Sequence, residues 1–180
     1  MFPEKDLKQF CEKLKAGEVV AAPAEGVYGY CADPFNKNAL EKLLAIKNRT
    51  AGKGFITLIR NLQDLEGLTQ TLSGGHIKEV KKYWPGPVTF IIPAAEGVPE
   101  LLTGGRGTVA VRLPRSDYMQ EYLEAWGGPL VSTSANISGQ MPATHYRDLS
   151  NEVFALKASS QLTGGISQVM DLITGQLLRP

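Results

Sequence analysis

Apolar residues recur every three or four positions in several stretches of the chain, as they do on the buried face of an amphipathic helix. Phe10, Cys11 and Leu14 show this spacing, and Gly17 follows where a helix would end. Asn36 stands before another such stretch and is a favourable N-terminal cap. The pattern predicts helices over residues 4–16, 37–47, 61–68, 75–83, 117–126 and 146–157.

Short, continuous apolar runs lie between these stretches and indicate buried strands. We expect strands over residues 19–22, 55–59, 88–92, 108–113, 130–132 and 168–173, and a turn at Thr174-Gly175 before a short last strand that ends at Arg179. Alternating helices and strands are typical of one central sheet covered by helices, with loops free to carry a site. No Pro/Ser-rich linker divides the 180 residues, so the sequence predicts a single α/β (α+β) domain over residues 1–180.

Composition narrows the choice of function class. The formal net charge of +1 argues against a protein whose whole surface binds nucleic acid, although a local basic hollow remains compatible with it. The first residues lack the pattern of a signal peptide, and no apolar run is long enough to span a bilayer, so we expect a cytoplasmic chain without membrane association. Cys11 and Cys31 have no metal-ligand spacing and are expected to be free, buried thiols, and no metal site is predicted.

Hydroxyl and amide side chains follow the apolar residues 129–131 directly. Ser132, Ser134 and Asn136 belong to this polar run, which closes with Gly139. Such a run either presents its side chains to a ligand or satisfies the backbone of its own turn. The residues by themselves leave both interpretations open.

Three cations gather where a helix is expected to end. Lys47, Arg49 and Lys53 accompany two glycines, and this combination suits phosphate oxygens or, alternatively, matches the dipole at a helix C-terminus. Arg112 interrupts an apolar strand just before Pro114, so it either faces solvent or binds an anion. Neither a Walker A sequence nor a G-x-G-x-x-G pattern occurs, so the common glycine-loop routes to a nucleotide are absent.

Taken in order, these segments closely resemble the YrdC-like family. The matching pieces are residues 23–29, Lys47-x-Arg49 with Lys53-Gly54, and residues 84–90, 110–114 and 132–139, and the likeness extends to Thr174-Gly175 and Leu178-Arg179. The resemblance covers nearly the whole chain. It implies a YrdC/RibB-like fold, in which helices flank a twisted mixed sheet with a basic concave face.

The resemblance also implies an activity. Short members of the family are threonylcarbamoyl-AMP synthases, which are nucleotidyltransferases. They join L-threonine, bicarbonate and ATP into L-threonylcarbamoyladenylate and release pyrophosphate. ATP would be a substrate, with Mg²⁺, and a downstream tRNA-modifying complex would accept the adenylate to make threonylcarbamoyladenosine. The reacting groups are anionic, so positioning and electrostatics would supply most of the rate.

The family motifs assign roles to nine residues of this chain. The catalytic, phosphate-facing cations would be Lys47, Arg49 and Lys53; the other nucleotide-binding residues would be Ser132, Ser134 and Asn136; and threonine and the carbamoyl group would meet Ala24, Thr89, Arg112 and Ser134. Ala24 departs from the family, which usually has Thr there. The missing hydroxyl removes one hydrogen bond, a net effect of about 1 kcal/mol.

Two alternatives remain beside the synthase. A family member that binds nucleotide but has lost threonine chemistry would also explain Ala24. A protein that binds double-stranded RNA or tRNA, or that acts in ribosome maturation, could use the same basic concave face. RNA readers interleave exposed aromatic residues with basic ones, whereas the hydroxyl-rich run beside Asn136 suits a small ligand better.

Overall fold

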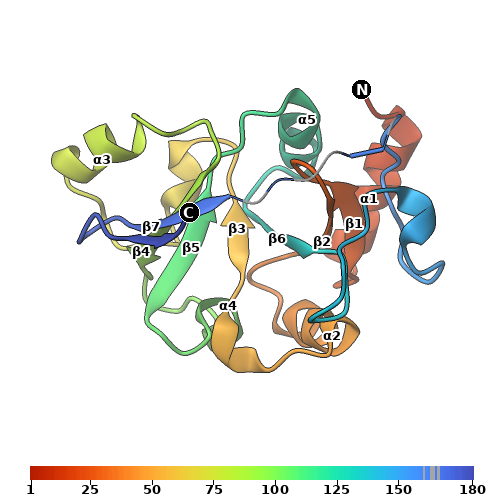
Figure 1. Ribbon diagram of the computed structural model, residues 1–180, viewed down its shortest axis with the longest axis horizontal. Helices are drawn as coiled ribbons and strands as arrows, with labels where there is room; N and C mark the ends of the chain where they lie inside the picture. The colour runs from red at the N-terminus through yellow and green to blue at the C-terminus, as the bar shows by residue number, and fades with distance from the viewer. Residues whose placement is uncertain (160, 163–164, 166) are drawn as a thin grey trace.

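Eight strands form one mixed sheet in the order β1-β2-β6-β3-β5-β4-β7-β8 (Figure 1). The computed structural model describes residues 1–159, 161–162, 165 and 167–180. The strands are β1 (Val20–Pro23), β2 (Tyr28–Ala32), β3 (Ile56–Leu58), β4 (Val88–Pro93), β5 (Thr108–Arg112), β6 (Leu130–Ser134), β7 (Gln168–Asp171) and β8 (Leu177–Arg179). The pairs β3–β5 and β4–β7 are parallel and the other neighbours are antiparallel.

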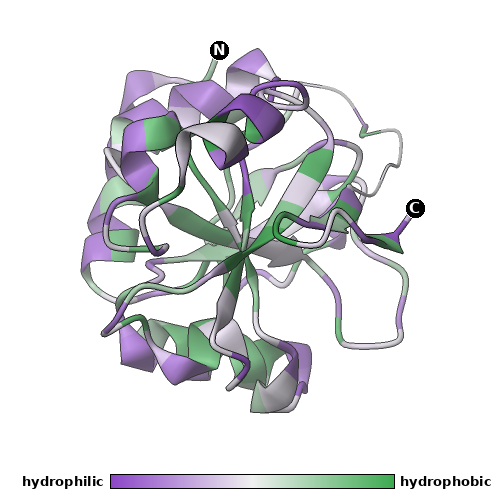
Figure 2. Ribbon diagram, turned by 90° about the vertical axis from the view of Figure 1, so that its left-hand side faces the viewer, coloured by the Kyte–Doolittle hydropathy of each residue, from purple (hydrophilic) through white to green (hydrophobic). Residues whose placement is uncertain are grey.

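Helices cover both faces of this sheet (Figure 2). The α-helices are α1 (Glu4–Lys15), α2 (Lys37–Lys47), α3 (Gly74–Val80), α4 (Glu100–Thr103) and α5 (Asp117–Trp126), and the short 3-10 turns are η1 (Ala51–Lys53), η2 (Leu62–Leu65) and η3 (Tyr146–Asp148). Helices α1 and α5 pack Phe10 and Tyr122 onto Leu58 and Leu130 of one face. Helices α2, α3 and α4 supply the second apolar cluster, against the other face.

The helices with the clearest apolar spacing were predicted correctly. Helices α1, α2 and α5 begin and end within one residue of the expected bounds, and the Asn36 side chain accepts the Ala39 N–H at 3.1 Å as the expected cap. All six expected strands and the final hairpin are present. None of the helices among the described residues is both long and apolar enough to cross a membrane. Cys31 is buried, Cys11 is partly buried, and both are free thiols.

Three expected helices differ from the structure. Residues 61–68 contain only the turn η2, and residues 75–83 form the shorter α3. The helix over 146–157 was wrong, because only η3 forms and the following chain runs along β1. There the Ala21 N–H donates to the Phe154 carbonyl at 2.8 Å, and the Leu156 N–H donates to the Ala21 carbonyl at 2.9 Å. Pairing with the sheet edge replaces the helical hydrogen bonds.

The sequence analysis did not predict strand β2, which packs closely against the neighbouring strand β6. Gly29 in β2 is opposite Ser134 in β6, and a Cβ atom at Gly29 would lie 2.6 Å from the Ser132 Oγ. A glycine is therefore required for the Ser132 side chain to lie across β2. The polar run that began at Ser132 is also partly strand, since β6 continues through Ser134.

Candidate functional site

Three of the residues selected from sequence lie on one face of the sheet. Ser132 in β6 is in register with Ile56 in β3, and Ile56 is in register with Ala110 in β5. Side chains alternate along a strand, so Ser134 and Arg112, each two residues further on, point to the same side as Ser132 and Ala110. Strand register therefore brings hydroxyls and a guanidinium together across the middle of the sheet.

A cavity of about 670 Å³ opens over this face. Six residues predicted from the sequence line it: Ala24, Arg49, Lys53, Arg112, Ser132 and Ser134. Other polar residues that line it include Glu25, Arg106, Thr108, Ser167 and Arg179. Five of these side chains are basic and one is acidic, so the cavity is a basic hollow in a chain with a net charge of only +1. Its volume is in the range of small-molecule sites.

Arg49 lines the cavity and has a hydrogen-bond donor that no described residue accepts. One terminal nitrogen donates to the Gly54 carbonyl at 2.7 Å, and the guanidinium lies 5.1 Å from the centre of the Phe55 ring. Its buried Nε has no hydrogen-bond partner among the described residues. Burial and the charge of Arg106 lower the pKa of Arg49. An anion between these cations would satisfy the Nε and reduce their repulsion.

Lys53 is placed by a tight turn. It ends η1, and Gly54 follows with φ 59°, in the left-handed region that favours glycine. A Cβ atom at Gly54 would lie 2.7 Å from the Leu102 carbonyl oxygen. The turn therefore packs directly against α4, and Lys53 is directed to the cavity rim without an ion pair to another described residue.

Arg112 is buried and paired, which excludes the solvent-facing interpretation. It is 8% exposed, and its Nε donates to the Gly86 carbonyl at 3.0 Å. One terminal nitrogen bonds the carboxylate of Glu25, whose other oxygen accepts the Ser116 hydroxyl at 2.7 Å. The second terminal nitrogen has no partner among the described residues. That nitrogen remains available for an anionic ligand.

Lys47 does not line the cavity. Its ammonium donates to the Ser134 carbonyl and to the Asn136 carbonyl and Oδ1, the last two at 3.1 and 3.0 Å. The residue is only 3% exposed, and burial together with the charge of Arg49 lowers its pKa to about 8. Lys47 therefore fastens the end of β6 to the end of α2.

Asn136 and Thr89 also lie outside the cavity lining. The Asn136 Oδ1 accepts the Ser134 hydroxyl at 2.7 Å, and its Nδ2 donates to the Gln140 carbonyl at 2.7 Å. Asn136 thus braces its own loop, as the capped-turn interpretation expects. Thr89 is fully buried and its hydroxyl donates to the Ser167 Oγ at 2.9 Å. Ser167, rather than Thr89, reaches the cavity.

The comparisons with known proteins identify the family of the chain. The family model Sua5_yciO_yrdC, described as "Telomere recombination", matches residues 12–180. The chain belongs to the Sua5/YciO/YrdC family. A threonylcarbamoyl-AMP synthase of Vibrio vulnificus is 38% identical over 182 residues, which cover 97% of each chain. The resemblance inferred from the motifs is confirmed.

Solved structures of the family share the fold. E. coli YciO superposes with a TM-score of 0.84 at 25% identity, over 98% of this chain and 89% of that one. P. abyssi Sua5 complexed with L-threonine gives a TM-score of 0.83 at 30% identity, over 95% of this chain. The present chain spans 52% of that Sua5 chain. The α/β fold with an open mixed sheet and flanking helices, expected from sequence, is therefore the fold of the Sua5/YciO/YrdC family.

Two basic residues of the cavity were missed in the sequence. Arg106 stands in Gly104-Gly105-Arg106-Gly107, and the same reasoning that selected the glycine-flanked Lys53 would have found it. Arg179 was named only as part of the family resemblance in the tail, and no local chemistry marks it as a site residue. It reaches the cavity because β8 pairs with β7, and its guanidinium donates to the Ser167 carbonyl at 2.7 and 3.0 Å.

The described side chains do not form a magnesium site of their own. Glu25 is the one carboxylate among the described residues lining the cavity, and Arg112 and Ser116 already bind it. The described part of the chain contains no group of three His, Cys, Asp or Glu residues placed to hold a metal. Mg²⁺ is normally bound through carboxylates together with substrate phosphates, so the residues present do not fit a resident ion.

Proposed function

We propose that the chain is a threonylcarbamoyl-AMP synthase, a nucleotidyltransferase that makes L-threonylcarbamoyladenylate and pyrophosphate from L-threonine, bicarbonate and ATP. The observation that carries the proposal is the cavity in which the cations Arg49, Lys53 and Arg106 lie with the hydroxyls of Ser132 and Ser134. Relatives of matching length bear this enzyme's name, and P. abyssi Sua5 was solved with L-threonine.

The chemistry needs such a cavity because its reactants repel one another. The threonine amine and bicarbonate condense to a carbamate with loss of water. A carbamate oxygen then attacks the α-phosphorus of ATP, the new P–O bond forms, and the bond to pyrophosphate breaks. Carbamate, triphosphate and pyrophosphate are all anions, so fixed positive charge lowers the energy of both the encounter and the transition state.

The residues divide into those that meet substrate and those that hold them in place. Arg49 and Lys53 would bind phosphate oxygens, and Ser132 and Ser134 would hydrogen-bond the nucleotide and the carbamoyl end. The free terminal nitrogen of Arg112 would bind the threonine carboxylate beside Ala24. Three further residues would have supporting roles, because their side chains bond other protein groups: Lys47, Thr89 and Asn136.

ATP would enter as its Mg²⁺ complex, because the protein supplies no carboxylate set for a resident ion. The product is a mixed anhydride that water hydrolyses, so it must pass to an acceptor. We expect that acceptor to be a tRNA-modifying complex.

The deciding experiment supplies the purified protein with ATP, bicarbonate, Mg²⁺ and L-threonine. Threonine-dependent pyrophosphate release and the adenylate are the expected products. Lys53→Ala and Arg112→Ala should each abolish them, with circular dichroism reporting an intact fold, whereas Lys81→Ala, at an exposed position outside the cavity, should retain full activity. RNA binding at physiological salt without any adenylate formation would refute the synthase.

A further inference from the structure

Glu25 is the one carboxylate among the described residues that line the basic cavity, and the proposed reaction does not use it. It lies in the loop 24–27 that joins β1 to β2, where the Ala24 N–H donates to the Val27 carbonyl at 2.9 Å. The loop is also bonded to the first turn of α5, since the Ala24 carbonyl accepts the Tyr118 hydroxyl. These contacts fix the backbone that carries Glu25 at this end of the cavity.

The hydroxyl of Ser116 holds Glu25 instead of capping a helix. Ser116 is the N-cap residue of α5, yet its side chain caps none of the backbone N–H groups of that helix, all of which the structure describes. It donates to the Glu25 carboxylate at 2.7 Å. A serine in this position ordinarily accepts a backbone N–H of the first turn and stabilises the helix. Ser73 does so at α3, where its Oγ accepts the His76 N–H at 3.2 Å.

Glu25 in turn fixes the plane of the Arg112 guanidinium. The carboxylate bonds one terminal nitrogen, and the Nε donates to the Gly86 carbonyl at 3.0 Å. Gly86 is itself held just beyond the end of β5, because its N–H donates to the Leu113 carbonyl at 2.9 Å. Two anchors on a rigid, planar group leave one direction for the remaining terminal nitrogen. Loss of Glu25 would leave a single anchor, about which the group could turn.

Basic residues of the cavity lie at both ends of β3. Arg49 and Arg106 precede β3 and β5, which run parallel, whereas Arg112 is in register with the last residue of β3. Arg49 and Arg106 carry like charge, and burial together with the charge of Arg106 lowers the pKa of Arg49. Arg112, by contrast, is neutralised by its ion pair with Glu25. The cavity therefore has a cationic end, which attracts phosphate oxygens, and a neutral end, which attracts them less.

We propose that Glu25 is a specificity-determining residue, which makes the neutral end of the cavity selective for a zwitterionic α-amino acid over a phosphate. The free terminal nitrogen of Arg112 binds the carboxylate of the amino acid. The Glu25 carboxylate has lone pairs beyond those that Arg112 and Ser116 use, and it accepts the ammonium group. Ser116 is a positioning residue that holds Glu25. The inference rests on the proposed function, because it takes threonine as the ligand of Arg112.

The test is equilibrium binding without ATP, by isothermal titration calorimetry of L-threonine and of 2,3-dihydroxybutanoate, in which a hydroxyl replaces the ammonium group. We expect the wild type to prefer L-threonine and Glu25→Gln to lower this preference about fivefold, the effect of losing one partly exposed charge partner. Inorganic phosphate should compete with L-threonine in Glu25→Gln and not in the wild type. An unchanged preference, or equal competition by phosphate in both proteins, would overturn the inference.

Two serine variants separate this role from a contribution to helix stability. Ser116→Ala removes the hydroxyl that holds Glu25 and should lower the preference for L-threonine about twofold, the effect of one weak hydrogen bond. Urea unfolding should show little loss of stability, because no cap is lost. Ser73→Ala removes a cap and should show the reverse. Ser116→Thr keeps the hydroxyl and should restore the preference, and a Ser116→Ala protein that binds both ligands as the wild type does would overturn the positioning role.

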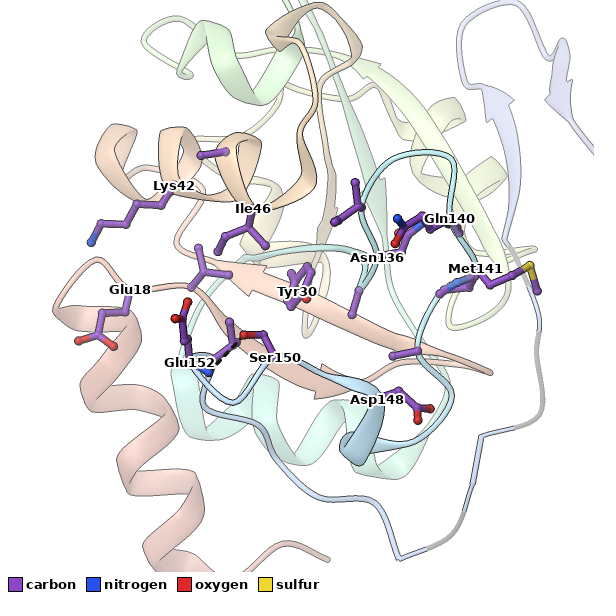
Figure 3. Close-up of a pocket in the computed structure, with 17 residues that line it drawn as sticks. Glu18, Tyr30, Lys42, Ile46, Asn136, Gln140, Met141, Asp148, Ser150 and Glu152 are labelled. Carbon is purple, nitrogen blue, oxygen red and sulfur yellow. Dashed lines mark hydrogen bonds between the residues drawn. The ribbon is translucent and has the colours of Figure 1, made fainter.

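A carboxylate of another cavity is the control for loss of charge. That cavity, of about 910 Å³, shares no described lining residue with the basic one, and Glu152 lines it (Figure 3). Glu152→Gln removes one negative charge, as Glu25→Gln does, and should leave the preference for L-threonine unchanged. Equal effects of the two substitutions would overturn the inference. A wild type that binds L-threonine but releases no pyrophosphate in the synthase assay would contradict the proposed function alone.

Discussion

Lys47 was selected from the sequence for its charge, but in the structure its ammonium hydrogen-bonds other groups of the protein. Its ammonium is surrounded by oxygen atoms of Ser134 and Asn136, and its pKa of about 8 lies below the ordinary value of 10.5. Between these two values the unfolded chain retains a proton that the native protein has lost. The free energy of unfolding contributed by this group therefore rises with pH across that window.

We expect this rise to disappear when Lys47 is replaced. The stability difference between the wild type and Lys47→Met should grow from pH 8 to pH 10.5, by at most about 1.4 kcal/mol per pH unit. Urea unfolding at several pH values measures this difference. Lys81→Met, which removes an exposed lysine, is the control for loss of one positive charge. A difference that stays constant with pH would contradict the buried, deprotonating ammonium.

Ala24 is the position at which we expect a substitution to raise the affinity for threonine. It lines the basic cavity, and its carbonyl accepts the Tyr118 hydroxyl at 3.1 Å, so its position is fixed. Ala24→Thr should lower the KM for threonine about fivefold, as expected for one added hydrogen bond of ~1 kcal/mol. Ala24→Val has the same branched shape without the hydroxyl. Equal KM values for the Thr and Val variants would show that no hydrogen bond forms.

At the scale of elements, the lack of a side chain at Gly29 allows β2 to pack closely against Ser132 of β6. An alanine there would place its Cβ atom 2.6 Å from the Ser132 Oγ, and the two strands would have to shift. We expect Gly29→Ala to lower the free energy of unfolding by about 1–3 kcal/mol, measured by urea unfolding.

The double variant provides the control. Ser132→Ala removes the hydroxyl that the new methyl group would meet, so Gly29→Ala/Ser132→Ala should recover most of the lost stability. A double variant as unstable as Gly29→Ala alone would show that backbone conformation, rather than the contact with Ser132, is responsible.

Local signals explain which elements were predictable. Helices α1, α2 and α5 are defined by apolar spacing within a dozen residues, and α2 also has the Asn36 cap; both signals are visible in the sequence. Strand β2 depends on β1 and β6, of which β6 lies about a hundred residues away. The helix over 146–157 failed for the same reason, since its backbone pairs with Ala21. Non-local pairing overrides local propensity.

Cavity residues could be predicted from sequence where neighbouring residues mark them. They could not be predicted where strand pairing or burial decides which way a side chain points. Arg49 and Lys53 stand next to glycines that signal a turn, and both line the cavity. Lys47 matches the same motif, but burial turns its ammonium toward the loop. Arg179 enters only because the tail folds beside β7. Sequence reasoning therefore selected a group of cations without fixing which of them face the cavity.

At the scale of the whole molecule, five of the nineteen Lys and Arg residues line one hollow that has a single carboxylate, Glu25, among its described residues. Because the net charge is +1 while five basic side chains line the cavity, attraction for ATP is local and screened by salt. We expect the KM for ATP to rise with ionic strength. Arg106→Gln should raise the KM about threefold at low salt and reduce its salt dependence, as steady-state kinetics would report.

Arg115→Gln is the matched control for this prediction. Arg115 is exposed and does not line the cavity, so its removal changes the net charge equally while leaving the hollow intact. If the two variants changed the KM for ATP alike, total charge rather than the local cluster would govern binding.

The chain that runs beside β1 also determines how molecules can associate. By bonding Ala21, residues 154–156 occupy one end of the sheet, so a strand from another molecule cannot add there. At the other end β8 has only three residues and Pro180 follows it. Strand addition at β1 is therefore blocked at Ala21, and the three residues of β8 offer another molecule only a short edge, which limits growth of the sheet into a fibre.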